Sequence, residues 1–104
     1  MEFWWIQIWE VKSEKAEEHD KLQKELREWN LKEEPEMRPR LRYLRLNEDG
    51  KELRMLVKTG FTDMAEVEAI RTRPRDEGYM KLHKIAMTCI VPDTHQERFW
   101  YDVT

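Results

Sequence analysis

The segment Phe3–Val11 reads FWWIQIWEV and gives the strongest structural signal in the chain. β-branched and aromatic residues dominate it, and it contains neither Gly nor Pro, so it predicts a β-strand. One face of this strand would carry Phe3, Trp5, Gln7, Trp9 and Val11, and the other would carry Trp4, Ile6, Ile8 and Glu10. A strand with one face in water should alternate apolar and polar residues, whereas this one is apolar on both faces. We therefore expect helices to cover one face and something else to cover the other.

Length and composition limit the class of protein. The 104 residues suffice for one domain with one core, spanning residues 1–104. Charged residues make up 39% of the chain and the net charge is −3, which gives no overall attraction for nucleic-acid phosphates. Scarce amides beside abundant Glu, Lys and Arg are typical of thermophilic proteins. The single Cys89, with no visible secretory signal or membrane-spanning run, predicts a cytoplasmic protein.

An amphipathic helix and a hairpin are expected next. The helix carries an apolar stripe at helical spacing that comprises Ala16, His19, Leu22, Leu26 and Trp29. Ser13 is its expected N-cap, and Pro35 ends the helical region. The β-like runs Arg40–Leu46 and Glu52–Gly60 flank a polar connection that ends in Gly, which is typical of a hairpin. The cationic side chains of these runs predict that part of one face meets water or an anion; they include Arg42, Arg45, Arg54 and Lys58.

A broken second helix and a last strand complete the chain. Asp63 and Glu66 resemble a capping box, and Pro74 interrupts the helix before it resumes at about Glu77–Ile90. Arg98–Val103 is the last predicted strand. The order β-α-β-β-α-β predicts an α+β, ferredoxin-like fold: a four-stranded antiparallel sheet with helices on one face and a second helix broken near Pro74.

This order, the length near one hundred residues and the interrupted segment FTDMAEVEAIRTRPRDEGYMKLHKIAMTCI at residues 61–90 resemble the dimeric α+β barrel superfamily. Its members include the antibiotic-biosynthesis monooxygenases, the stress-responsive barrel proteins and the haem-degrading monooxygenases. The resemblance implies that the sheet face away from the helices packs against the same face of a second copy, forming a dimeric α+β barrel.

A homodimer is also expected without the resemblance, because this short chain has enough helix for one layer only. Burying several large side chains, at roughly 25 cal/mol per Å², would offset a substantial cost of association. The alternative is a monomer whose Arg and Lys stems shield the second face.

The aromatic residues also suit a pocket for a hydrophobic or aromatic small molecule between helices and sheet. The candidate pocket residues are Gln7, Trp5, Trp9, Tyr43 and Trp29. Cofactor-independent members of the superfamily oxidise polyphenols, and the resemblance implies such a monooxygenase-like activity with no cofactor. The candidate catalytic residues are His19, His83 and Tyr79, since imidazole and phenol groups can move protons.

Several alternatives remain at this point. His19 could be a buried imidazole bonded to a neighbour, and His95 is expected to be exposed to solvent. Haem-degrading members hold iron through a histidine placed like His83, but they use an Asn where this chain offers Gln7 and a Trp that its second helix lacks. RNA-recognition domains share the element order, yet the third strand lacks their stacking aromatics. A non-catalytic structural or ligand-sensing homodimer is the main alternative function, and no cluster with metal-ligand spacing is present.

Overall fold

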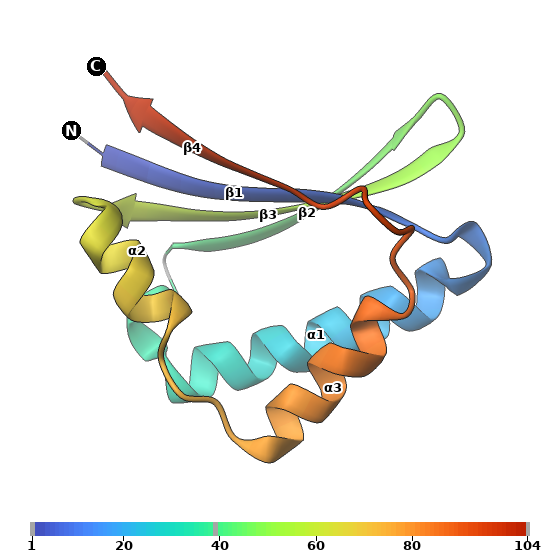
Figure 1. The fold of residues 1–104 in the computed structure, drawn as a ribbon, viewed down its shortest axis with the longest axis horizontal. Helices are drawn as coiled ribbons and strands as arrows, with labels where there is room; N and C mark the ends of the chain where they lie inside the picture. The colour runs from blue at the N-terminus through green and yellow to red at the C-terminus, as the bar shows by residue number, and fades with distance from the viewer. Residues whose placement is uncertain (1, 39, 104) are drawn as a thin grey trace.

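The computed structural model describes residues 2–38 and 40–103 of the chain. The elements are β1 (Glu2–Val11), α1 (Ala16–Glu33), β2 (Leu41–Glu48), β3 (Lys51–Phe61), α2 (Met64–Arg71), α3 (Glu77–Met87) and β4 (Gln96–Asp102), with 3-10 turns at Ser13–Lys15 and Pro35–Met37. The strands form one antiparallel sheet in the order β2-β3-β1-β4. All three helices lie on the same side of this sheet (Figure 1). The predicted ferredoxin-like α+β fold is confirmed, including the break between α2 and α3.

The inner face of β1 packs against the helices and holds two core clusters. Phe3 and Trp5 belong to the first, whose other buried members are Met37, Phe61, Val67 and Ile70. Trp9 and Val11 belong to the second, together with Cys89 and Ile90. Gln7 lies between these pairs along the strand and is the one polar side chain on the inner face of β1. The apolar core is therefore interrupted at the middle of β1.

A β-bulge sets which residues of β3 face the helices. The pairing of β1 with β3 shifts by one residue between Phe3, opposite Phe61, and Trp5, opposite Lys58. Gly60 lies in the bulge with a φ of 82°, a conformation that residues with a Cβ rarely adopt. Strict alternation would put residues 58 and 61 on opposite faces of the strand. Because of the bulge, both Phe61 and Lys58 face the helices.

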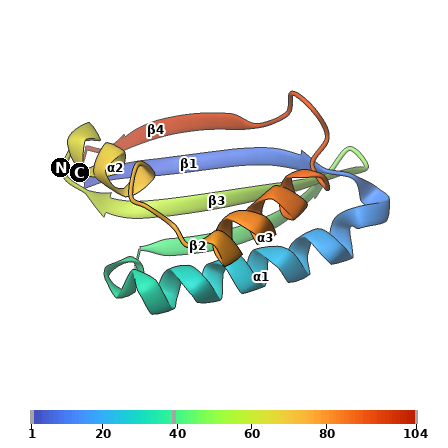
Figure 2. The ribbon, with the colours of Figure 1, turned by 60° about the horizontal axis from the view of Figure 1, so that its bottom comes forward.

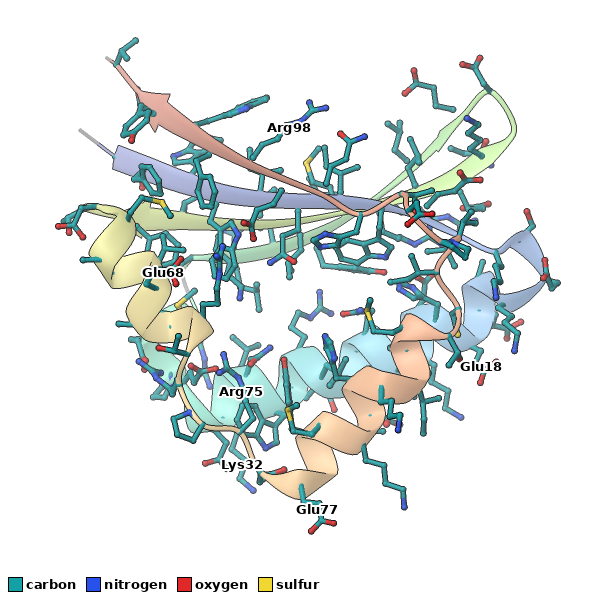
Figure 3. All side chains as sticks on the ribbon, in the orientation of Figure 1. Glu18, Lys32, Glu68, Arg75, Glu77 and Arg98 are labelled. Carbon is teal, nitrogen blue, oxygen red and sulfur yellow. The ribbon has the colours of Figure 1, made fainter. Side chains whose placement is uncertain are left out.

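The opposite face of the sheet, the outer face, is apolar and has no helix over it among the described residues (Figure 1). It comprises Trp4, Ile6 and Ile8 of β1, Leu44 and Leu46 of β2, Leu53, Met55 and Val57 of β3, and Trp100 of β4, which the strand register places side by side. Leu44, Leu46 and Trp100 are each about half exposed, at 50%, 52% and 53%. Arg98 also lies on this side of the sheet (Figure 3).

Of the two predicted helix caps, Asp63 is confirmed and Ser13 is not. Asp63 caps α2 by accepting a hydrogen bond from the backbone N–H of Glu66 at 3.0 Å. The prediction of Ser13 as the N-cap of the long helix was wrong, because Ser13 begins a 3-10 turn and its side chain caps no helix. The hairpin turn is only two residues long, Asp49 and Gly50, both with positive φ. No helix of the described residues has the length and apolar character needed to cross a membrane.

Helix α3 ends at Met87, earlier than the predicted Ile90. Ile90 instead forms a β-bridge with Val11, and the backbone N–H of Lys12 donates to the carbonyl of Cys89 at 2.8 Å. These contacts attach the end of α3 to the end of β1 and fix how far α3 stands from the sheet.

Candidate functional site

A cavity of about 400 Å³ lies between the sheet and helices α1 and α3. The sheet contributes Gln7 and Trp9 of β1, Leu41 and Tyr43 of β2, and Leu56 and Lys58 of β3. The helical wall is formed by Gln23, Leu26, Arg27 and Asn30 of α1 and by Tyr79, His83 and Met87 of α3, with Ile90 and His95 beyond them. Figure 2 shows α1 and α3 running side by side over the strands. The cavity occupies the middle of the sheet, between the two core clusters.

Gln7 is held in the cavity wall by His95. The Oε1 of Gln7 lies 3.0 Å from the Nε2 of His95, and the ring of His95 stacks on Trp9 with ring centres 6.1 Å apart. His95 is exposed, as expected, but it also lines the cavity, a role that sequence reasoning missed. The contact orients the amide of Gln7, leaving its NH₂ group available to a ligand.

Tyr79 and His83 project from successive turns of α3 into the cavity wall. Their rings are nearly parallel, with ring centres 6.3 Å apart. Burial lowers the pKa of His83, and the nearby positive charge of Arg75 lowers it further. His83 is therefore mainly neutral at neutral pH, which is the form that can accept a proton.

Two predicted pocket residues support the cavity from behind and do not line it. Trp29 packs on Tyr79 with ring centres 4.5 Å apart, and its indole N–H donates to Asp76 at 2.6 Å. Trp5 lies in the first core cluster, and its indole N–H donates to Glu97 at 2.9 Å.

His19 is fully buried and lies outside the cavity lining. The indole N–H of Trp9 donates to Nε2 of His19 at 3.0 Å. An indole nitrogen can only donate, so Nε2 must be unprotonated and the proton of the neutral ring lies on Nδ1, 3.3 Å from Asp20. Burial lowers the pKa of His19, in agreement with a neutral ring. This geometry matches the alternative in which His19 is a buried imidazole bonded to its neighbours.

A buried ion pair holds the same network together. Arg54 is 1% exposed and donates to both carboxylate oxygens of Asp20, at 2.8 and 3.0 Å, and to Glu52 at 3.0 Å. The hydroxyl of Tyr43 donates to Asp20 at 3.0 Å. Burial and the negative charge of Asp20 raise the pKa of Tyr43, so its phenol stays protonated. The ring of Tyr43 therefore lines the cavity, while its hydroxyl is hydrogen-bonded within the buried polar network.

Lys58 is a cavity residue that sequence reasoning did not select. Its Nζ lies 4.5 Å from the centre of the Trp5 ring. Burial lowers the pKa of Lys58 to about 8; the positive charges of Arg75 and Arg71 lower it as well, while Glu34 acts in the opposite direction. Figure 3 shows Arg75 on the inner side of the connection between α2 and α3.

Metal binding finds no support in the described part of the chain. No group of three or more His, Cys, Asp or Glu side chains there is arranged to hold a metal ion.

The chain shares its ferredoxin-like α+β fold with solved structures described as antibiotic biosynthesis monooxygenases and as a dimeric ferredoxin-like protein. No family model matches the sequence, and no curated protein matches it either. A mutant of SnoaB, a cofactor-independent oxygenase from Streptomyces nogalater, superposes with a TM-score of 0.60 at 12% identity, over 99% of this chain and 94% of that one.

Two other solved structures match as well. An antibiotic biosynthesis monooxygenase has a TM-score of 0.63 at 15% identity, over 98% of this chain and 99% of that one. A dimeric ferredoxin-like protein of unknown function from Jannaschia sp. CCS1 has a TM-score of 0.63 at 12% identity, over 98% and 100%. These matches confirm the predicted resemblance at the level of the fold.

Proposed function

We propose that this chain binds a flat hydrophobic or aromatic small molecule in the cavity between the sheet and helices α1 and α3. The observation that carries the proposal is a cavity of about 400 Å³ lined by the rings of Trp9, Tyr43 and Tyr79. Small-molecule sites typically have volumes of roughly 300–1,000 Å³, are largely apolar and contain a few convergent polar groups. Gln7 and His83 supply such groups here.

Cofactor-independent oxygenation in the same cavity is the second candidate, favoured by the neutral imidazole of His83 beside Tyr79. In this reaction His83 takes a proton from an acidic substrate CH₂ group, and the resulting carbanion reduces O₂. The CH₂ group becomes C=O and the second oxygen atom leaves as water. SnoaB, which shares the fold, is described as a cofactor-independent oxygenase. His19 would be a positioning residue, because it fixes the indole of Trp9.

A homodimer is the proposed assembly, with the outer face of one copy packed against the outer face of another. The half-exposed Leu44, Leu46 and Trp100 on that face support this arrangement, because monomeric proteins rarely expose large continuous apolar patches. The Jannaschia protein with this fold is described as dimeric. Cys89 is free and buried, which fits the proposed cytoplasmic location.

Ligand binding is tested by filling the cavity from α3. Met87 lines the cavity and is 46% exposed, whereas Met80 on the same helix is 54% exposed and does not line it. We expect Met87→Trp to weaken the binding of the neutral probe 1-naphthol at least about tenfold by calorimetry, because the indole occupies the site. The matched control Met80→Trp should bind as the wild type does. Equal binding by all three proteins, or no binding by the wild type, would contradict the proposal.

Catalysis is tested separately by oxygen uptake with a polyphenol that carries an acidic CH₂ group as substrate. A loss of uptake in His83→Ala, with uptake retained in the neighbouring control Lys84→Ala, supports the oxygenase. Probe binding without any oxygen uptake by the wild type would favour the non-catalytic, ligand-sensing homodimer instead.

A further inference from the structure

The charge of the cavity wall is one-sided. Among the described residues that line it, Lys58 and Arg27 are cationic, and neither Asp nor Glu is present. Arg75 adds a third positive charge behind Tyr79, with its guanidinium 5.6 Å from the centre of the Tyr79 ring. Its buried Nε has no hydrogen-bond partner among the described residues. Arg75 is paired with Glu34, whereas the two cations of the lining, Lys58 and Arg27, have no ion pair with a carboxylate among the described residues.

Among the described residues, no carboxylate forms an ion pair with Lys58. Glu34 is the acidic group that acts on it, and Glu34 already accepts from Arg73 at 2.6 Å and pairs with Arg75 at 3.4 Å. Within residues 2–38 and 40–103, the ammonium of Lys58 contacts the face of the Trp5 ring. A poorly hydrated cation without a counter-charge costs free energy, and the lowered pKa of Lys58 reflects that cost.

We propose that the ligand of this cavity is an aromatic carboxylate, whose aromatic ring lies among Trp9, Tyr43 and Tyr79 and whose carboxylate pairs with the ammonium of Lys58. The proposal rests on the proposed ligand-binding function and specifies the chemistry of the ligand. A carboxylate carries its charge throughout the neutral pH range, so it supplies the counter-charge that the cavity lacks. Arg27 on the opposite wall strengthens the attraction for an anion.

The test compares two probes of nearly the same shape, 2-naphthoate and its neutral amide 2-naphthamide. We expect the wild type to bind the carboxylate at least about tenfold more tightly, as measured by calorimetry. Lys58→Met should weaken carboxylate binding by about tenfold to a hundredfold and change amide binding by less than about twofold. Lys58→Arg retains a positive charge and should keep part of the preference. Lys24→Met removes an exposed lysine of α1 outside the cavity and should behave as the wild type.

Proton uptake provides a second readout that a purely structural role of Lys58 would not produce. Near pH 8.5 the free amine and the ammonium of Lys58 coexist, and a bound carboxylate raises the pKa of the amine. Carboxylate binding should then take up protons, detected as a binding heat that depends on the ionisation enthalpy of the buffer. Arg71, Arg75 and Glu34 are the charged groups that act on Lys58. Lys58→Met should lose the effect, and 2-naphthamide should not cause it.

The outcomes separate the two proposals. If the wild type binds neither probe, both the ligand-binding function and the carboxylate assignment are wrong. If both probes bind equally and Lys58→Met changes the affinity for neither of them, ligand binding stands and the carboxylate assignment is overturned. Lys58 is then a structural lysine whose ammonium packs on the ring of Trp5. Circular dichroism of every variant confirms that the fold is retained.

Discussion

The hydrogen bond from Trp9 to His19 links the wall of the cavity to the buried polar network. It uses the one imidazole nitrogen that could accept a proton, so His19 cannot be protonated without breaking the contact with Trp9. Asp20 meanwhile accepts from Arg54, Tyr43 and the Nδ1 side of His19. Each of these side chains therefore depends on the protonation state of its neighbours.

Acid should destabilise the protein through His19. The folded-state pKa of His19 lies below its ordinary value of 6.5, so below pH 6.5 the unfolded chain binds protons more readily than the folded chain. The free energy of unfolding should therefore fall as the pH drops from 6.5 towards 5, by on the order of 1 kcal/mol from this group. His19→Gln can still accept from Trp9 and donate to Asp20 and should show a shallower decline in urea titrations. A variant with the same pH slope as the wild type would contradict this explanation, and His95→Gln serves as the exposed control.

Helices α2 and α3 are short, with 8 and 11 residues, so their N-terminal caps matter more than they would in a long helix. Asp63 and Asp76 perform the same local task, each accepting a backbone N–H three residues on. Asp76 has a second task, because its other oxygen accepts the indole N–H of Trp29 from α1. The start of α3, and with it Tyr79 in the cavity wall, is thereby attached to α1.

Substitution of the two caps should give unequal effects. Asp63→Ala removes one capping bond and should lower the melting temperature by about 4–8 °C. Asp76→Ala removes the cap and the bond to Trp29, so we expect a larger decrease together with weaker binding of 1-naphthol. Asp76→Asn retains one oxygen for the cap but presents an NH₂ group, which cannot accept, to Trp29, so it should recover only the part of the melting temperature that the cap supplies. If Asp76→Ala lowers the melting temperature no more than Asp63→Ala does, the hydrogen bond between Trp29 and Asp76 does not contribute to stability.

Sequence patterns predicted the elements well and the inward-facing residues of β3 poorly, and the bulge explains the difference. The strand signal of Phe3–Val11, the Asp63 cap and the break at Pro74 are local, so they can be read from neighbouring residues. Which face Lys58 occupies depends on a register shift that is visible only when β3 is paired with β1. The burial of Arg54 against Asp20 likewise depends on how α1 packs on the sheet. The sequence pattern predicted only that the cationic side chains of the hairpin would meet water or an anion.

The two faces of the sheet differ in what covers them: helices lie over the inner face, and no helix of the described residues lies over the outer face (Figure 1). The inner face contains two core clusters and, between them, the cavity. The helices of this chain cover the inner face and form the other side of the clusters and of the cavity. The outer face has apolar side chains on all four strands and no helix over it among the described residues; Ile6 and Val57 are already buried there, whereas Leu44, Leu46 and Trp100 are about half exposed. The half-exposed apolar side chains of β2 and β4 are the ones that a self-complementary partner surface would bury, beside Arg42 and Arg98 on the same face.

A charge on the outer face should therefore dissociate the proposed dimer without unfolding the chain. Leu44 lies opposite Met55 on that face and is half exposed, so Leu44→Glu is tolerable in a single copy. In a two-fold dimer each substitution occurs twice, and we expect dimer affinity to fall at least about tenfold per substituted side chain. Sedimentation at micromolar concentration distinguishes a mass of 12.9 kDa from twice that value. Met80→Glu, on the helical side, should leave the dimer intact. A wild type that sediments as one copy would refute the assembly, and the half-exposed Leu44, Leu46 and Trp100 would then face water.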